Sequence, residues 1–273
     1  MLRLETDIGY WLVTHVDHAN LAGRFAAQWG NGLFRSPEPR APVLKGISRH
    51  DDGWRERDAQ PQITRQGKPS AFSVELVGKY SAFEEIDLAD YLAVRDRAVR
   101  LIAEEDPYAA ILVSLHTYNL LTERADRSTI APAQLPLLDD FLIQQKALQQ
   151  SQREKITLET GFTLEGWGDT AIHDNFRLLQ ATDNLSLLAC VDYGQPATLL
   201  HPLPLNDGGY QTVKVASIGV RKFRLDPYPF ADDALTFCFP ARHIKGKFFA
   251  KAEELQEQFS SAQLVQLEVT VVA

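Results

Sequence analysis

The chain has 273 residues, a formal net charge of −8 and 45% hydrophobic residues, as expected for a soluble globular protein of one large domain or one domain with an appendage. Because the balance is acidic and the basic residues form no cluster, we expect no binding of nucleic acid through its phosphates. No run of about 18 apolar residues is present, so neither a transmembrane helix nor a membrane partner is expected.

The N-terminal stretch carries Glu5 and Asp7 and lacks the basic start and the apolar core of a signal peptide. The two cysteines, Cys190 and Cys238, form no CxxC motif, and both stand among apolar residues. Buried free thiols of this kind are typical of a reducing compartment. We therefore expect a cytoplasmic protein.

Helices dominate the predicted structure up to residue 192. Residues 2–13 contain one short strand, and Thr14 is then expected to cap a helix, because Asp17 completes a capping-box arrangement. This helix runs to about Trp29, and its apolar face includes His15 and His18. Further helices are predicted over residues 42–52, 88–105, 107–120, 132–159 and 169–191, with a break at residues 161–168.

Residue types that bind metals recur on the apolar faces of these helices. His50 and Asp51 stand at the C-terminal end of the second helix, which stops at Gly53. His116 and Asp183 lie on apolar faces of later helices. A buried carboxylate without a partner is costly, so these positions need either a cation or a hydrogen-bonded cluster. Mixed histidine and carboxylate ligands suit manganese, iron, nickel or zinc, and we expect one or two such ions.

Two residues are assigned to catalysis, Asp52 and His116. A carboxylate beside a metal-bound water can accept its proton, which makes Asp52 a candidate general base, although it could equally be a solvated residue at a helix end. Four more residues are candidates for contacts with the metal ligands or the substrate: His15, Trp54, Arg55 and Asp58. The stretch from residue 54 to about 85 is irregular, and its place directly after the histidine–aspartate pair favours a lid over the site.

After Tyr193 the pattern changes to short strands. Strands are predicted at Val213–Val220, Leu235–Phe239 and Leu264–Val272, with a helix at Lys245–Phe259. We therefore expect a mainly α fold, in which a multi-helix bundle of residues 1–192 carries a small β-rich (α+β) appendage of residues 193–273. The last strand could pair across a homodimer.

The ordered set of histidines and aspartates resembles the HD-domain superfamily of metal-dependent phosphohydrolases. The matching segments are Asp17-His18-Ala-Asn-Leu-Ala, Ile47-Ser-Arg-His50-Asp51-Asp-Gly and Leu179-Gln-Ala-Thr-Asp183-Asn-Leu-Ser. This resemblance implies an HD-like bundle in which the metal ligands are His18, His50, Asp51 and Asp183. It also implies hydrolysis of a phosphoester or phosphoanhydride in a small phosphorylated molecule or nucleotide. His116 resembles an additional histidine that some relatives use for a second metal or for substrate.

The sequence departs from that superfamily in two places. Ser48 and Arg49 stand where an apolar helix end is usual, and the segment before Asp183 is longer than in many relatives. Asp126, Asp169 and Asp174 are therefore weaker candidates for the last ligand. The whole chain also resembles an uncharacterised bacterial family that is catalogued only as a domain of unknown function, and that resemblance implies no activity.

Two other functions stay open. The same ligands, with His116 and a further residue such as His15, could hold a di-iron site for oxidative chemistry. Alternatively, the helical domain is not an enzyme, and its cluster is structural or binds a small ligand. Other chemistries lack their motifs, since the chain contains no phosphate-binding loop, no nucleophile elbow and no HExxH motif.

Overall fold

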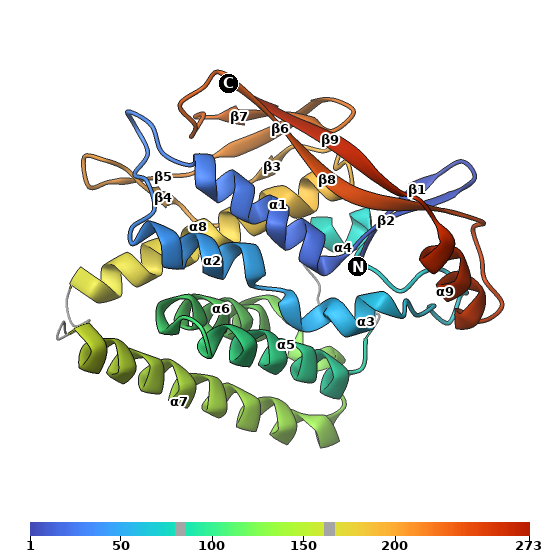
Figure 1. Cartoon of the computed structure of the whole chain (residues 1–273), viewed down its shortest axis with the longest axis horizontal. Helices are drawn as coiled ribbons and strands as arrows, with labels where there is room; N and C mark the ends of the chain where they lie inside the picture. Colours follow the sequence, from blue (N-terminus) through green and yellow to red (C-terminus); the bar gives the residue numbers. More distant parts are fainter. Residues whose placement is uncertain (80–85, 161–166) are drawn as a thin grey trace.

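The computed structural model describes residues 1–79, 86–160 and 167–273, which form an α+β fold with helices on one face of a curved sheet (Figure 1). This sheet has seven strands in the order β1-β2-β8-β9-β7-β6-β3. The expected mainly α fold with a small β-rich appendage is therefore wrong. The sheet is a full layer of the molecule, and strands from both ends of the chain build it.

Neighbouring strands of the sheet run antiparallel, except for the parallel pair β7 and β9. Its strands are β1 (Leu2–Thr6), β2 (Gly9–Val13), β3 (Ala197–Thr198), β6 (Lys214–Gly219), β7 (Lys222–Asp226), β8 (Ala234–Lys245) and β9 (Leu264–Val272). Two short strands, β4 (Leu203–Pro204) and β5 (Tyr210–Gln211), pair separately. The predicted strand at 264–272 is confirmed, and it lies inside the sheet between β8 and β7. The homodimer stays a prediction.

The N-terminal segment contributes two strands to the sheet, which the sequence pattern did not indicate. It forms the hairpin β1–β2 rather than a single strand, and β2 pairs with β8 near the other end of the chain. Gly9 permits this pairing, because a Cβ atom there would lie 1.9 Å from the backbone oxygen of Ile244. A pairing between distant segments leaves no periodic signal in either of them, so it was not apparent from the sequence.

The helices agree in place with most of the predicted ones. The described helices are α1 (His15–Gln28), α2 (Arg40–Arg49), η1 (Asp52–Trp54), α3 (Arg55–Ala59), α4 (Val74–Lys79), α5 (Leu88–Ala103), α6 (Pro107–Asn119), the π-helical turn η2 (Leu120–Arg124), η3 (Arg127–Thr129), η4 (Pro132–Gln134), α7 (Leu135–Thr160), α8 (Trp167–Cys190) and α9 (Ala252–Ser261). The predicted cap is confirmed, since the Thr14 hydroxyl accepts from the Asp17 backbone N–H. The helix predicted from Lys245 begins only at Ala252, because Lys245 still belongs to β8.

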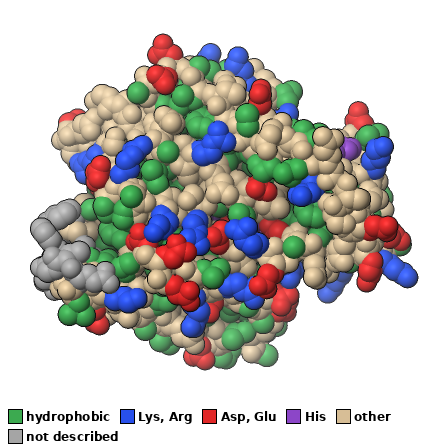
Figure 2. Space-filling model, viewed as in Figure 1, with side chains coloured by type: hydrophobic (Ala, Val, Ile, Leu, Met, Phe, Trp, Pro, Cys, Tyr) green, Lys and Arg blue, Asp and Glu red, His purple; other side chains and the backbone are tan. Residues whose placement is uncertain are grey.

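Helices α1 and α8 lie against the sheet, α2 and α6 lie beyond them, and α7 is outermost (Figure 1). Phe25 of α1 meets Phe237 of β8 at 4.8 Å between ring centroids, so sheet and helices share one core. On the face shown in Figure 2, acidic and basic side chains are intermixed. Among the described residues, no helix is long and apolar enough to cross a membrane.

The stretch after Asp51 is more ordered than expected. It contains η1, α3 and α4, so most of the predicted irregular loop has local structure. Residues 80–85 of that loop, and residues 161–166 of the predicted break before α8, lie outside the described residues. The lid therefore stays a prediction.

Gly53 in η1 sets how closely this stretch approaches α5. A Cβ atom at Gly53 would lie 1.9 Å from the backbone oxygen of Val94 and 2.7 Å from the backbone nitrogen of Ala98. The backbone of a packed helix cannot move away without disturbing its packing. Gly53→Ala should therefore lower the free energy of unfolding by about 3 kcal/mol. Urea unfolding measures this loss. Gly32→Ala is the control, because a Cβ atom there meets nothing within 4 Å; equal stability of both variants would contradict the prediction.

Candidate metal centre

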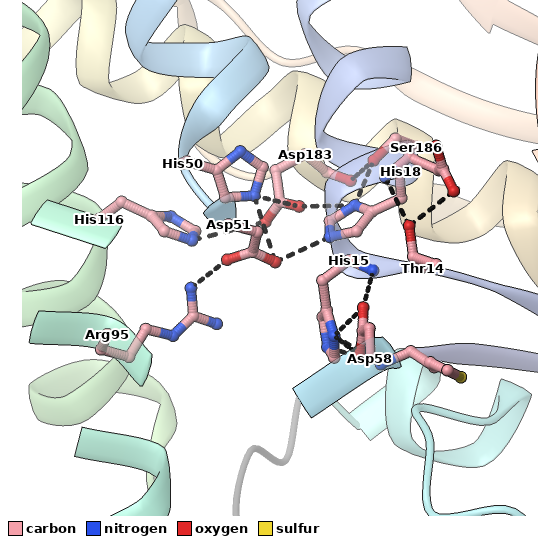
Figure 3. Close-up of polar contacts among 12 residues, drawn as sticks. Thr14, His15, His18, His50, Asp51, Asp58, Arg95, His116, Asp183 and Ser186 are labelled. Carbon is pink, nitrogen blue, oxygen red and sulfur yellow. Dashed lines mark hydrogen bonds and ion pairs between the residues drawn. The ribbon is translucent and has the colours of Figure 1, made fainter. Parts of the chain in front are cut away.

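The four predicted ligands and His116 come from four different helical segments and meet in the interior (Figure 3). His18 lies on α1, His116 on α6 and Asp183 on α8, while His50 and Asp51 follow directly after α2. All are buried. Their side chains form two groups able to hold a metal ion, His18–His50–Asp51 and His50–His116–Asp183, and in each group the ligand atoms lie within 4.8 Å of one another. The expectation that buried histidines and aspartates could hold a metal ion is confirmed.

The orientation of His18 is set by the last turns of α8. Ser186 donates its hydroxyl hydrogen to the Asp183 backbone oxygen at 2.8 Å, so its oxygen accepts from His18 Nδ1 at 3.0 Å. The proton of a neutral His18 ring therefore sits on Nδ1. Its Nε2 atom lies 2.9 Å from Asp51 Oδ2, and because a carboxylate oxygen only accepts, a proton or a metal ion must lie between these two atoms. A second hydrogen bond that fixes the ring in this way is usual for metal-binding histidines.

His50 is oriented by its own helix. Its Nδ1 atom donates to the Ile47 backbone oxygen at 2.8 Å, which points Nε2 into the cluster. There Nε2 lies 3.4 Å from Asp183 Oδ1 and 3.8 Å from Asp51 Oδ2. Within the described part of the chain, His50 Nε2 and Asp183 Oδ1 are buried without a hydrogen-bond partner. Buried polar atoms are rarely left unsatisfied, so this pair needs a cation, which can be a proton on His50 or a metal ion.

Arg95 of α5 compensates part of the negative charge. Its Nη1 atom donates to Asp51 Oδ1, which leaves Oδ2 directed at His18. Its guanidinium group lies over the rings of Trp54 and Tyr91, at 5.6 and 5.1 Å from their centroids. Burial alone would raise the pKa of Asp51, but Arg95 and then His50 hold it well below its usual range.

Opposite pKa shifts separate His50 from His116, which both lie near Asp183. Burial lowers the pKa of His50, but the carboxylates of Asp51 and then Asp183 together raise it by more than burial lowers it. The resulting pKa is about 9. Burial lowers the pKa of His116 to about 3, so this ring is neutral. Burial also raises the pKa of Asp183, yet its contact with His50 outweighs this and leaves the pKa below the usual value. Without a metal, the proton on His50 is therefore the cation that the two carboxylates hold.

This proton makes the metal-free fold sensitive to alkali. Because the pKa of His50 rises from 6.5 to about 9 on folding, its contribution is full below pH 6.5 and is lost as the pH rises through 9. In the presence of a chelator, the free energy of unfolding should fall by about 3 kcal/mol across this window. Urea unfolding at several pH values measures it. The decline should be absent in His50→Gln, and an unchanged decline in that variant would contradict the assignment.

His15, Trp54 and Asp58 form a neighbouring cluster. His15 Nδ1 lies 3.1 Å from both carboxylate oxygens of Asp58, and its ring stacks on Trp54 at 4.0 Å. Burial lowers the pKa of His15 to about 4. The ring centroids of His15 and His18 are 6.0 Å apart, so this cluster supports the α1 end of the site. In neither of the two candidate metal groups do these three residues supply a ligand.

Asp52 and Arg55 face away from the cluster, although they are close to Asp51 in the sequence. Asp52 accepts from Arg49 Nε at 2.7 Å and from Arg55 Nη2 at 3.3 Å. The chain leaves α2 at His50 and turns into η1, so successive side chains point to different sides. Neither residue lines the cavity next to the metal ligands. Asp52, the predicted general base, and Arg55, a predicted contact of the ligands or the substrate, therefore lie outside the lining of this cavity.

The weaker candidates for the last ligand lie elsewhere. Asp126 accepts from Ser128, Asp169 contacts Arg153, and Asp174 accepts from Tyr210 at 3.0 Å. Of the four aspartates considered for this position, Asp183 is the one in a candidate metal group.

Sequence reasoning missed Arg95. It occupies the buried stripe of α5 together with Tyr91, Leu92, Val99 and Ile102. A single charged residue on an apolar stripe was the available signal, because a buried guanidinium needs an anion. The identity of that anion could not be read from α5 itself.

A cavity adjoins the cluster, and all five candidate ligands contribute to its wall. The rest of the wall is mostly apolar, but two arginines, Arg95 and Arg124, also line it. The π-helical turn η2 continues α6, and residues of both elements, His116, Leu120 and Arg124, line this cavity. Candidate metal ligands, two arginines and apolar side chains therefore meet around one cavity.

Residues 1–246 match the model of a family described as a protein of unknown function (DUF3891). The search of curated proteins found no match, and the search of solved structures found none either. The predicted whole-chain resemblance to a family of unknown function is thereby confirmed, while the HD-domain resemblance still rests on the order of the ligands alone.

Proposed function

The chain belongs to the DUF3891 family, and we propose that it holds a divalent metal ion and hydrolyses a phosphoester or phosphoanhydride, as the resemblance to HD-domain phosphohydrolases implies. The observation that carries the proposal is the pair of orphaned buried atoms, His50 Nε2 and Asp183 Oδ1, at the centre of the ligand set. Such atoms are costly without a cation between them.

The donor set fits such an ion. His18 and His50 each donate one ring N–H to a fixed acceptor and turn the other nitrogen inward. Asp51 and Asp183 contribute carboxylate oxygens. Two imidazoles and two carboxylates suit manganese, iron, nickel or zinc. A bound ion of this kind lowers the pKa of its water and polarises a phosphoryl oxygen.

The residues of the chain would supply positioning and charge. Arg95 holds Asp51 so that one carboxylate oxygen faces the ligand group, and its guanidinium also lines the cavity. Arg124 adds a second cation on the same wall, and guanidinium groups match phosphate oxygens well. Apolar side chains such as Phe72, Leu76 and Leu187 would exclude water from the reacting group.

The test is a screen of phosphomonoesters and nucleotides with protein loaded with manganese, iron, nickel or zinc. We expect turnover that a chelator abolishes and that Asp183→Asn lowers by more than about 100-fold. Asp169→Asn should retain activity, because Asp169 pairs with Arg153 outside the cavity. Chelator-resistant turnover would contradict the proposal. Oxygen uptake by iron-loaded protein without phosphate release would replace it with the di-iron alternative, and no turnover despite bound metal would favour a binding protein.

A further inference from the structure

Hydrogen bonds link His116, one of the candidate metal ligands, to Gln180 and then to His201. Gln180 of α8 is buried, and its Nε2 atom lies 3.3 Å from His116 Nδ1. Its Oε1 atom lies 2.8 Å from Nε2 of His201 in the loop after α8. His201 has a backbone φ of 63°, in the left-handed region that few non-glycine residues adopt. The sequence assigned no role to Gln180 or His201.

The two ends of the Gln180 amide decide where the His116 proton lies. With its oxygen on His201, Gln180 donates its N–H to His116 Nδ1, which must accept. A neutral imidazole then carries its single proton on Nε2. This N–H faces Asp183 Oδ2 at 3.9 Å, an attractive arrangement. The opposite amide orientation would place a His116 lone pair against that carboxylate, which is unfavourable unless a second cation separates them.

The two candidate metal groups therefore differ in whether their histidines can turn an unprotonated ring nitrogen toward a metal ion. In the group His18–His50–Asp51, Ser186 and Ile47 accept the outer ring protons of both imidazoles, so each Nε2 can serve as a ligand once a metal ion takes the place of its proton. In the group His50–His116–Asp183, His116 turns an N–H inward instead. A protonated ring nitrogen cannot bind a metal ion.

We infer that Gln180, anchored by His201, holds His116 as a hydrogen-bond donor, so that the site takes one metal ion and offers the His116 N–H to a bound anion beside it. This inference rests on the proposed metal site for the ion count, but the state of the His116 ring can be tested without metal. Gln180 and His201 are positioning residues in this scheme, since they act through His116.

Gln180→Glu reverses the hydrogen bond. A carboxylate can only accept from His116 Nδ1, which moves the ring proton to Nδ1 and frees Nε2 as a ligand. Elemental analysis after loading with manganese should give one ion per chain for the wild type and two for Gln180→Glu. The double variant Gln180→Glu/His116→Gln is the control for the added charge, and it should return to one ion. Two ions in the wild type, one ion in Gln180→Glu, or two in the double variant would overturn the inference.

Nitrogen NMR of the metal-free protein separates this inference from the proposed function. The His116 ring should show its proton on Nε2 in the wild type and on Nδ1 in Gln180→Glu. His201→Ala should weaken the preference, because the Gln180 amide loses its anchor. A wild-type His116 protonated on Nδ1 would overturn the inference whether or not metal binds. If the His116 ring carries its proton on Nε2 but the protein binds no metal, the proposed function and the count of one ion are wrong. The positioning role of Gln180 would still be established.

Discussion

Replacing His50 by alanine should empty the metal site. His50 belongs to both candidate metal groups, and its Nε2 atom is one of the two orphaned atoms at their centre. Purified wild-type protein should carry close to one divalent ion per chain, whereas His50→Ala should bind the same metal more than about 100-fold more weakly. Elemental analysis of the purified proteins and titration with manganese measure both quantities.

The pH dependence of metal binding gives the same prediction a second readout. With a pKa of about 9, His50 is protonated in the metal-free protein at neutral pH, so a metal ion must displace its proton. Affinity should weaken by up to about tenfold for each pH unit below 9.

His243→Ala is the matched control for His50→Ala, because His243 contacts Thr6 and Trp11 on the sheet and lines no part of the cavity. A wild type without metal, or equal metal in wild type and His50→Ala, would contradict the assignment.

Replacing Arg95 by methionine should destabilise the metal-free protein strongly. Methionine keeps most of the side-chain volume but leaves Asp51 as a buried carboxylate without its guanidinium partner. Breaking a buried ion pair from one side costs about 3–5 kcal/mol. A bound divalent ion would supply a cation next to Asp51, so saturation with metal should stabilise the variant more than it stabilises the wild type. Urea unfolding with and without manganese measures both effects.

Arg97→Met provides the comparison on the same helix. Arg97 is partly exposed and pairs with the exposed Glu56, so its loss should cost no more than about 1 kcal/mol. Equal losses for Arg95→Met and Arg97→Met would show that Asp51 does not depend on the buried pair. A metal effect of the same size in wild type and Arg95→Met would show that the ion does not sit next to Asp51.

The helices could be predicted because their signals are local. Thr14 and Asp106 accept from backbone N–H groups at the starts of α1 and α6, as their residue types indicate. The sheet could not be predicted as a layer, because β2 pairs with β8 from the opposite end of the chain. The register of such a pair depends on neighbouring strands and turns rather than on either segment alone.

The candidate ligands could be predicted from the sequence, but the side chains that contact and orient them could not. His18, His116 and Asp183 stand on apolar helix faces, which marks them as inward-facing polar residues. Adjacency in sequence was misleading for Asp52, because the chain turns between α2 and η1 and directs it to Arg49. Arg95 was recognisable only as a charge on an apolar stripe.

The sequence by itself determined which residues face the interior, because a helical period of about 3.6 residues places every third or fourth side chain on one face. It thereby identified buried imidazoles and carboxylates that needed partners. The tertiary structure alone decided that faces from α1, α2, α6 and α8 meet at one point, and that Ser186, Ile47 and Gln180 set the ring protons. Hydrophobic periodicity indicates which side chains are buried. Where these side chains meet, and which ring nitrogen carries each proton, depends on contacts between segments that are distant in the chain.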